Sequence, residues 1–417
     1  MRKILNDPKL ITQGRKNLAL AESNMLALMS LRNRFKKEKT FKGIRIGMAL
    51  HITKETGVLV RTFIDGGAKV AIASCNPLST QDDIAAALAK EGVQVYGYKG
   101  ETRKEYYEYL KKVVATKPQI TIDDGCDLVT EIHTKNKNLL KHCIGGCEET
   151  TTGVIRLRAM EKDGALKYPI VAVNDNDTKH LMDNYYGTGQ STLDGLLRAT
   201  NVLIAGKTVV VIGYGDCGKG VAMRVKGLGA KVIVTEVKPF RALQAYMDGY
   251  RVMPMVEAAP LGDIFITVTG NCEVIRVEHM KKMKSGAIMA NAGHFDIEID
   301  LAGLKKIAIK KEQVRPFMKK YTLKGGKELY VIADGRLVNL AAAEGHPSEV
   351  MSMSFCGQAL AVEYLLKNAS KLKPGVHLLP DSLDEKISRL QLSAMKVKID
   401  KLTEGQKKYL SGWQEGT

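Results

Sequence analysis

The stretch Thr208-Val-Val-Val-Ile-Gly-Tyr-Gly-Asp-Cys-Gly-Lys-Gly220 carries the strongest fold signal in the chain, and Lys231-Val-Ile-Val-Thr-Glu236 follows it closely. An apolar, β-branched run leads into Gly213, Gly215 and Gly218, which have G-x-G-x-x-G spacing. Such glycines permit a tight turn, close approach of the backbone to a pyrophosphate, and close packing of helix on strand. Glu236 ends the second apolar run, where an acceptor for a ribose hydroxyl is expected. The order of strand, glycines, helix, strand and acid predicts a dinucleotide-binding domain.

The chain on either side of this motif alternates between strand and helix patterns. Strands are expected at Ile44–Leu50, Lys69–Ala73, Val93–Tyr96, Gln119–Ile122 and Ile170–Val173, and after the motif at Ile264–Val268, Ala287–Asn291 and Glu328–Ile332. Amphipathic stretches such as Gln81–Lys90 and Lys104–Val114 lie between strands. The alternation predicts parallel sheets with helices on both faces.

The fold class is therefore α/β, with two doubly wound, Rossmann-like domains and a small helical tail. We expect residues 1–185 together with 347–385 to form a substrate domain, 186–346 the dinucleotide domain, and 386–417 the tail. Helices are expected over the first 35 residues, over Val350–Leu366, and after the capping box Thr403-Glu-Gly-Gln406. Tyr186-Gly187-Thr188-Gly189 has the composition of a hinge or of a simple loop between the domains.

The charge and the cysteine pattern limit the classes of function that the protein can have. A formal net charge of +18 raises a nucleic-acid hypothesis. The lysines, however, are dispersed, their short runs lack interleaved aromatics, and segments such as Lys305–Lys311 suit a helix surface. We therefore expect no nucleic-acid partner. There is no secretory signal and no apolar run long enough to cross a membrane, and the seven cysteines form no C-x-x-C pair. A reduced, cytoplasmic protein without membrane contact is expected.

Polar side chains follow four of the expected strands. They are His51, then Ser74-Cys75-Asn76 with Ser79-Thr80-Gln81-Asp82, then Asp123-Asp124-Gly125, and finally Asn174-Asp175 with Lys179 and Asp183. Each could be a helix cap or a turn residue. Because ligands of open α/β sheets bind beyond the carboxyl ends of the strands, the four sets together predict a substrate crevice.

Three further patterns point to chemistry but also have structural explanations. Lys179 and Asp183 are spaced i, i+4, which would give a surface ion pair or, beside a nicotinamide, a pair that binds a substrate hydroxyl and accepts its proton. Glu148-Glu-Thr-Thr-Thr-Gly153 suits a helix N-terminus or a ligand contact. His294 and His346 sit in glycine-flanked turns on either side of the dinucleotide domain.

Taken together, these residues resemble the S-adenosyl-L-homocysteine hydrolase family over nearly the whole chain, and the short tail resembles its archaeal or thermophile members. The motifs that carry the resemblance are Cys75-Asn-Pro-Leu-Ser-Thr-Gln-Asp82, Asp123-Asp-Gly-Cys-Asp-Leu128, Glu148-Glu-Thr-Thr-Thr-Gly153, Val173-Asn-Asp175, Thr178-Lys179, Asp183-Asn184, Gly213-Tyr-Gly-Asp-Cys-Gly-Lys-Gly220, Gly293-His-Phe-Asp296, Gly335-Arg-Leu-Val-Asn339 and Gly345-His-Pro-Ser348. The resemblance implies tightly bound NAD, transient oxidation of a ribose 3′-hydroxyl, elimination of homocysteine, addition of water and re-reduction.

The resemblance also implies roles for single residues. Lys179 and Asp183 would serve the 3′-hydroxyl, while Asp124 and His51 would handle the protons of C4′ and of the leaving group or water. The expected catalytic set is His51, Asp124, Lys179, Asp183 and His294; the substrate set adds Thr53, Glu55, Glu149, His346 and Met351. The expected NAD contacts are Thr150, Thr151, Thr152, Asn184, Gly213, Gly215, Asp216, Cys217, Gly218, Lys219, Gly220, Glu236, Arg241, Ala292, Gly293, His294 and Asn339. No metal is expected.

The chain departs from the family at several positions. Lys238 and Arg241 follow Glu236 and could tolerate a 2′-phosphate, although the acid favours NAD. Thr188 replaces a common cysteine. Many members have a longer tail that covers the NAD of a neighbouring subunit; here Lys407, Lys408 and Tyr409 are the candidates to replace it. The family resemblance implies a homo-oligomer, expected to be a tetramer.

Three alternatives to an adenosyl-specific hydrolase remain open. The first is an S-inosyl-L-homocysteine hydrolase, although Glu55 would accept from the amino group of adenine and repel a 6-oxo group. The second is a conventional dehydrogenase that releases NADH. The third is a non-catalytic, NAD-binding regulatory paralogue, which is expected to lose the proton-transfer groups that this chain retains.

Overall fold

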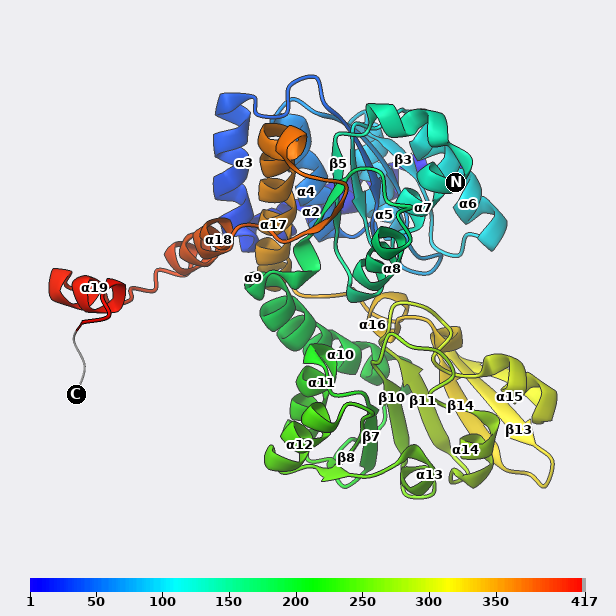
Figure 1. Cartoon of the computed structure of the whole chain (residues 1–417). Coiled ribbons are helices and arrows are strands. Elements are labelled where there is room, and N and C mark those ends of the chain that lie inside the picture. Colours follow the sequence, from blue (N-terminus) through cyan, green and yellow to red (C-terminus); the bar gives the residue numbers. More distant parts are fainter. Residues whose placement is uncertain (415–417) are drawn as a thin grey trace.

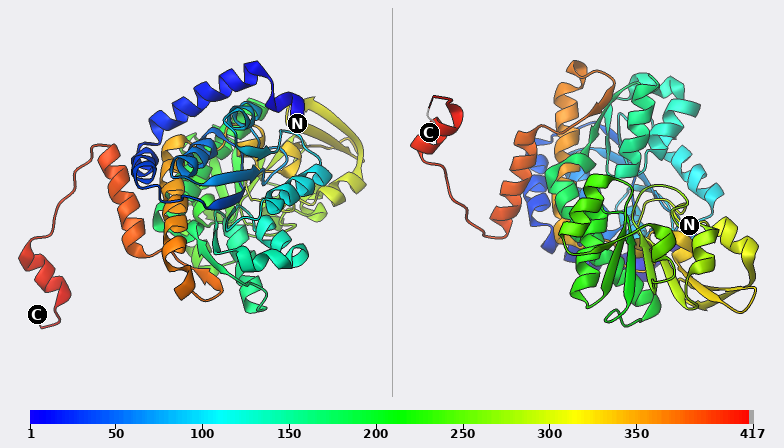
Figure 2. Two further views of the ribbon diagram at one scale, coloured as in Figure 1. Left: turned by 90° about the horizontal axis from the view of Figure 1, so that it is seen from above. Right: turned by 60° about the horizontal axis from the view of Figure 1, so that its bottom comes forward.

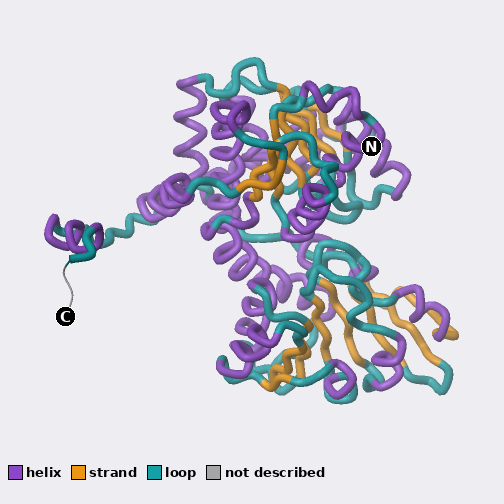
Figure 3. The backbone as a smooth tube through the Cα atoms, viewed as in Figure 1, coloured by secondary structure: helices purple, strands orange, loops and turns teal. Residues whose placement is uncertain are grey.

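The computed structural model describes residues 1–414, which form two α/β units and a C-terminal tail (Figure 1). Strands occupy the centre of each unit and helices cover them (Figure 3). The tail predicted for 386–417 extends to residues 415–417, which lie outside the described residues. None of the described helices has the length and apolar character needed to cross a membrane.

The first unit contains a seven-stranded, fully parallel sheet in the order β15-β6-β5-β4-β1-β2-β3. Its strands are β1 (Arg45–Ala49), β2 (Lys69–Ala73), β3 (Gln94–Tyr96), β4 (Ile120–Asp123), β5 (Gly145–Glu148), β6 (Pro169–Ala172) and β15 (Gly375–His377). The sequence pattern does not predict β5 or β15. Strand β5 has the sequence Gly-Gly-Cys-Glu, without β-branched residues, and β15 is only three residues long.

Helices cover both faces of this sheet. They are α1 (Arg2–Leu5), α2 (Pro8–Asn24), α3 (Leu26–Glu38), α4 (Lys54–Asp65), α5 (Asp82–Lys90), α6 (Arg103–Ala115), α7 (Asp127–Lys135), η1 (Lys137–His142), α8 (Thr151–Lys162) and α17 (Ser348–Asn368). Helix α17 comes from beyond the second unit and packs on α3, α4 and β5. The core between them is apolar and includes Phe35, Phe63, Phe355 and Leu360.

The second unit contains an eight-stranded sheet in the order β12-β13-β14-β11-β10-β7-β8-β9. Its strands are β7 (Thr208–Ile212), β8 (Lys231–Thr235), β9 (Arg251–Val252), β10 (Ile264–Thr267), β11 (Ala287–Asn291), β12 (Ala308–Arg315), β13 (Met318–Leu323) and β14 (Glu328–Ile332). Its helices are α10 (Thr188–Thr200), α11 (Asp216–Gly227), α12 (Pro239–Met247), α13 (Met255–Ala258), α14 (Val277–Lys282), α15 (Leu301–Ile307) and α16 (Val338–Ala341).

Two predictions for this unit are wrong. The sheet is mixed rather than parallel, because β12, β13 and β14 form an antiparallel meander at its edge. Lys305–Lys311 is not one helix surface: α15 ends at Ile307, and Lys310 and Lys311 lie on exposed β12. Alternation along an exposed edge strand leaves lysines at successive positions without a helical period.

The segment between the units is helical. Helix α9 (Asp177–Lys179) leads into the π-helical segment η3 (His180–Gly187), which continues directly into α10. The simple loop allowed for Tyr186–Gly189 is therefore absent, because the glycines there are accommodated within helical turns. The wide π-helical turn is a feature often found at functional sites. The chain returns to the first unit through 3₁₀ segment η4 (Ala333–Gly335), α16 and the residues before α17.

The C-terminal region starts with 3₁₀ segment η5 (Ala369–Lys371) and α18 (Asp381–Ala394), which packs on α3 and α17. Helix α19 (Glu404–Ser411) begins with the predicted capping box, in which Thr403 and Gln406 bond each other's backbone N–H. Both views in Figure 2 show α19 well away from the two units. Leu410 and Trp413 are exposed there.

Candidate active site

A cavity of about 1400 Å³ lies between the two units, beyond the carboxyl ends of their parallel strands. This is the position that the strand-end argument predicts. Most of the predicted site residues line it, namely His51, Thr53, Glu55, Asp124, Glu149, Thr150, Thr151, Thr152, Lys179, Asp183, Asn184, Gly213, Gly215, Asp216, Cys217, Glu236, Arg241, Ala292, Gly293, His294, Asn339, His346 and Met351. Gly218, Lys219 and Gly220 are not among its lining residues.

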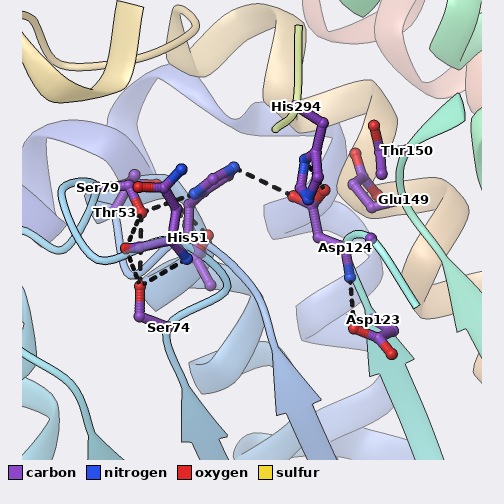
Figure 4. Close-up of polar contacts among 12 residues, drawn as sticks. His51, Thr53, Ser74, Ser79, Asp123, Asp124, Glu149, Thr150 and His294 are labelled. Atoms are coloured by element: carbon purple, nitrogen blue, oxygen red, sulfur yellow. Dashed lines mark hydrogen bonds and ion pairs between the residues drawn. The ribbon is translucent and has the colours of Figure 1, made fainter. Parts of the chain in front are cut away.

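Asp124, which directly follows β4, lies between two histidines (Figure 4). His51 Nε2 is 3.5 Å from Asp124 Oδ2, and His294 Nδ1 is 3.4 Å from Asp124 Oδ1. Gly125 makes this approach possible, because a Cβ at that position would lie 2.4 Å from His294 Nε2. The second unit thus brings His294 onto the strand ends of the first. The ligand atoms of the three residues all lie within 4.8 Å of one another, near enough to hold a metal ion, so the absence of a metal site stays a prediction.

The His294 side chain is buried, and that of His51 is mostly so, with 14% of it exposed. Burial lowers the pKa of His51 to about 4, although Asp124 opposes the shift, and burial also lowers the pKa of His294. Both rings are therefore neutral near pH 7. The Nδ1 atom of His51 lies 2.7 Å from Ser79 Oγ, and this contact orients the ring with Nε2 toward Asp124. Neutral imidazoles beside a carboxylate are suited to proton transfer.

Lys179 occupies the centre of a second buried cluster. Its ammonium is 3.1 Å from Asp183 Oδ2, 2.8 Å from Asn184 Oδ1 and 3.7 Å from Glu149 Oε1. Lys179 and Asp183 share a helical face as predicted, but the pair is buried rather than a surface ion pair. Burial opposes the charged form of Lys179, yet Asp183 and Glu149 raise its pKa above the ordinary value.

Asp183 also contacts His346, which arrives on the segment that returns from the second unit. His346 Nδ1 hydrogen-bonds Asp183 Oδ1, and its Nε2 lies 3.4 Å from Thr188 Oγ1. Burial raises the pKa of the Asp183 carboxyl, but Lys179 and His346 outweigh it and hold the pKa well below its usual range. Asp183 therefore remains a carboxylate that accepts hydrogen bonds.

Glu149 is held by two residues that sequence reasoning missed. Ser354 Oγ and Gln358 Nε2, both on α17, donate to the two carboxylate oxygens of Glu149. Burial raises the pKa of Glu149 to about 7, and Lys179 opposes the shift. No local signal links these residues, since more than 200 positions separate them in the sequence.

At another end of the same cavity, Thr53 and Glu55 lie at the N-terminus of α4, and Met351 lies on α17. Thr53 is the N-cap and accepts from Thr56 N. Glu55 lies in the first helical turn, where a carboxylate is favoured, and Ser348 Oγ donates to its Oε1 at 2.6 Å. This part of the cavity presents a buried acceptor beside an apolar side chain.

The glycine motif forms the turn predicted for dinucleotide binding. Gly213 has φ of +104°, which favours glycine, and helix α11 begins after Gly215. Gly218 lies against the turn, because a Cβ there would be 2.1 Å from the Gly213 carbonyl oxygen. Gly218 therefore allows α11 to pack closely against the turn that follows β7. Gly220 packs against the Tyr185 carbonyl in the same way.

The second unit offers groups that fit NAD. Glu236 Oε2 accepts from Tyr214 N at 2.8 Å and Oε1 accepts from Val237 N at 2.7 Å, which fixes the acid at the end of β8. Asn339 Nδ2 donates to Ser191 Oγ, but the buried Oδ1 has no hydrogen-bond partner within residues 1–414. An unpaired acceptor in the cavity wall is suited to a ligand amide such as a nicotinamide carboxamide.

Glu298 is a further residue that sequence reasoning missed. Its buried carboxylate accepts from Thr269 N at 3.0 Å and Gly270 N at 2.8 Å, and so fixes the loop after β10 that lines the cavity. Burial raises the pKa of Glu298, while these hydrogen bonds lower it.

Comparison with known proteins identifies the family. Residues 3–141 match the family model "S-adenosyl-L-homocysteine hydrolase", and residues 184–345 match "S-adenosyl-L-homocysteine hydrolase, NAD binding domain". The chain is similar to the S-inosyl-L-homocysteine hydrolase of Methanocaldococcus jannaschii (60% identical) and to the adenosylhomocysteinases of Saccharolobus solfataricus (58%) and Aquifex aeolicus (54%), each over 99% of both chains. The cofactor of the second unit is NAD. The chain belongs to the S-adenosyl-L-homocysteine hydrolase family.

Proposed function

We propose that the protein reversibly hydrolyses S-adenosyl-L-homocysteine to adenosine and L-homocysteine. The observation that carries this proposal is one continuous cavity in which the Lys179 cluster, the Asp124 cluster and the Glu55 carboxylate meet the glycine turn of the NAD-binding domain. A thioether is a poor leaving group, and its departure requires stabilisation of an adjacent carbanion. Groups that remove a hydroxyl proton and a carbon-bound proton within one cavity suit that need.

The first step concerns the ribose 3′-hydroxyl. The Lys179 ammonium binds the oxygen of this hydroxyl and the Asp183 carboxylate takes its proton, while NAD, when bound, supplies a reversible hydride acceptor for the 3′-carbon. Asn184 and Glu149 fix the Lys179 ammonium, so that it approaches the 3′-oxygen of the ribose from one direction. His346 keeps Asp183 ionised by its contact with Oδ1. The product is a 3′-ketone, whose neighbouring C4′ proton is acidic.

The second step breaks the carbon–sulfur bond. Asp124 or His51 removes the C4′ proton, and the electron pair left on C4′ expels the sulfur from C5′, which takes up a proton to give homocysteine. Water then adds at C5′, C4′ regains a proton, the 3′-carbon regains its hydride, and Asp183 returns the proton to the 3′-oxygen. Asp124 and His51 lie close enough to pass protons to one another. His294 lies beside the other oxygen of the Asp124 carboxylate.

Thiol release from the adenosyl and inosyl substrates, assayed side by side, tests the proposal. We expect a higher kcat/KM for S-adenosyl-L-homocysteine, because the Glu55 carboxylate accepts from a 6-amino group and repels a 6-oxo group. No NADH should accumulate during turnover, since the hydride returns to the substrate. Equal or better turnover of the inosyl compound would instead identify the protein as an S-inosyl-L-homocysteine hydrolase.

We further propose the division into a substrate domain (1–185 and 347–385), an NAD domain (186–346) and a tail. The two sheets, built from strands within 45–172 with 375–377 and within 208–332, support this division. All seven cysteines are free, which supports a cytoplasmic site of action. Exposed Leu402, Leu410 and Trp413 on the extended tail support a homo-oligomer, proposed to be a tetramer and testable by light scattering.

A further inference from the structure

Lys54 stands next to the residue that faces the purine but does not itself line the cavity. It is the first residue of α4, directly before Glu55, and its side chain is 14% exposed. Its ammonium lies 3.3 Å from Glu55 Oε1. A buried carboxylate is therefore paired with a cation on the side away from the ligand space.

The two oxygens of Glu55 have different surroundings. Oε1 receives both the Lys54 ammonium, at 3.3 Å, and the Ser348 hydroxyl, at 2.6 Å. No hydrogen bond from residues 1–414 reaches Oε2. Since Glu55 is 1% exposed and lines the cavity, Oε2 is the oxygen left to accept from a ligand. Two fixed donors on one oxygen also restrict rotation of the carboxylate.

Lys54 is itself held from the other side. Its Nζ lies 3.0 Å from Glu344 Oε2, and Gln81 links the two backbones by accepting from Lys54 N and donating to Glu344 O. Arg198 holds the second oxygen of Glu344 at 3.3 Å. Glu344 belongs to the segment that carries His346 and Ser348. The ammonium is therefore fixed between two carboxylates and cannot turn into the cavity without leaving both.

We propose, on the basis of the function proposed above, that Lys54 is a positioning residue for purine specificity. Together with Ser348 it fixes Oε1 of Glu55, so that Oε2 accepts a hydrogen bond from the 6-amino group of the purine. Lys54 does not contact the purine. Glu344 supports this role by anchoring the ammonium above α4.

The chemistry of a carboxyl group explains why the cation matters for specificity. An ionised carboxylate can only accept hydrogen bonds, which suits a 6-amino group and opposes a 6-oxo group. Without Lys54 the carboxylate loses one of the two donors that fix Oε1 and can turn away from the 6-amino group, whereas a 6-oxo group makes no hydrogen bond to it. Removal of Lys54 should therefore lower the affinity for the aminopurine and spare or increase the affinity for the oxopurine. A purely structural ion pair would change both affinities equally.

Binding of two nucleosides to the NAD-loaded protein tests this proposal. The probes are 3′-deoxyadenosine and 3′-deoxyinosine, which lack the hydroxyl that is oxidised and so report binding alone. For Lys54→Met we expect about 10-fold weaker binding of 3′-deoxyadenosine by calorimetry, with unchanged or tighter binding of 3′-deoxyinosine. Lys54→Arg should restore the wild-type ratio, and Glu344→Gln should shift it in the same direction by about 3-fold, since Lys54 keeps its contact with Glu55.

Each outcome decides the proposal. It is overturned if Lys54→Met leaves the ratio of the two affinities unchanged, whether both fall together or neither moves, or if the wild-type protein binds neither nucleoside. The proposed function fails separately, if the wild-type protein releases no thiol from S-adenosyl-L-homocysteine. A changed binding ratio without thiol release would support the role of Lys54 and reject the reaction.

Discussion

The two halves of the cavity differ in the chemical groups that they present to a ligand. The half that belongs to the seven-stranded sheet presents charged side chains, among them Asp124, Glu149, Lys179 and Asp183. The half that belongs to the eight-stranded sheet presents a glycine turn, a helix N-terminus and backbone amides, with Glu236 already bonded to the backbone. The first half is equipped to move protons, and the second to hold a dinucleotide by close approach.

This difference predicts that substitutions in the two halves affect different properties of the protein. A change in the first half should remove catalysis while NAD stays bound, because its side chains contact the nucleoside. A change in the second half should release NAD while the proton-transfer groups remain in place. The predictions below test whether the halves separate in this way, in order of decreasing effect.

Loss of the Lys179 ammonium should have the largest effect. In Lys179→Ala the 3′-hydroxyl loses the ammonium that binds its oxygen and holds the Asp183 carboxylate beside it, so we expect thiol release to fall about 1000-fold. The NAD content after gel filtration should match the wild type. Circular dichroism controls for folding, since Asp183 and Glu149 would lose their cation. Full activity of the variant would exclude the role of Lys179.

The glycine turn offers the reciprocal test. In Gly218→Ala the new Cβ would lie 2.1 Å from the Gly213 carbonyl oxygen, so the turn must shift, and we expect about 100-fold weaker NAD binding. Gly227→Ala is the matched control on the same helix, because a Cβ there meets no atom within 4 Å. If both variants retained NAD equally, the turn would not be the dinucleotide site.

The unpaired oxygen of Asn339 should contribute less. Asn339→Ala removes one buried acceptor from the cofactor half, and we expect about 10-fold weaker binding of NAD to the cofactor-free protein in a fluorescence titration. Ser191→Ala removes only the support for the Asn339 amide and should weaken binding less. An unchanged NAD affinity in Asn339→Ala would mean that Oδ1 does not contact the cofactor.

The smallest effect concerns stability and its dependence on pH. The pKa of Glu149 is about 7 because burial raises it from its ordinary value, so the folded protein holds this proton more tightly than the unfolded chain. The resulting destabilisation appears as pH rises from about 4.5 to 7. Glu149→Gln should therefore raise the unfolding temperature of the cofactor-free protein at pH 8 more than at pH 4, while lowering thiol release.

Glu101 provides the control for this prediction. It is buried away from the cavity, and burial raises its pKa to about 8. Glu101→Gln should stabilise the protein at high pH in the same way without loss of thiol release. A stabilisation of Glu149→Gln that is equal at both pH values would contradict the pKa shift.

The sequence predicts the site better than it predicts the sheets that form it. Residues after strand ends converge because parallel strands share one carboxyl edge, and this rule brings together His51, Asp124 and Lys179. Strand β5 was not predictable from periodicity, since Gly-Gly-Cys-Glu is too short and too small to show a pattern. Its position becomes evident only when β4 and β6 pair with it.

The supporting contacts could not be predicted. Ser354 and Gln358 reach Glu149 from a helix that follows the entire NAD-binding unit, and Glu298 fixes a loop 28 residues before it. Such contacts depend on how helices pack on sheets, and no local spacing encodes them. The π-helical turn at η3 likewise results from packing, because glycines and aromatics at 185–189 are compatible with loop and helix alike.

The return of α17 and β15 to the first sheet fixes an order of assembly during synthesis. Strands β7 to β14 all precede residue 347, so the NAD-binding unit leaves the ribosome complete while the first sheet still lacks an edge strand and its long helix. Ser354 and Gln358, the partners of Glu149, emerge after that. A nascent chain therefore has its dinucleotide site ready before its nucleoside site, and cofactor supply during translation becomes a factor in the yield of active enzyme.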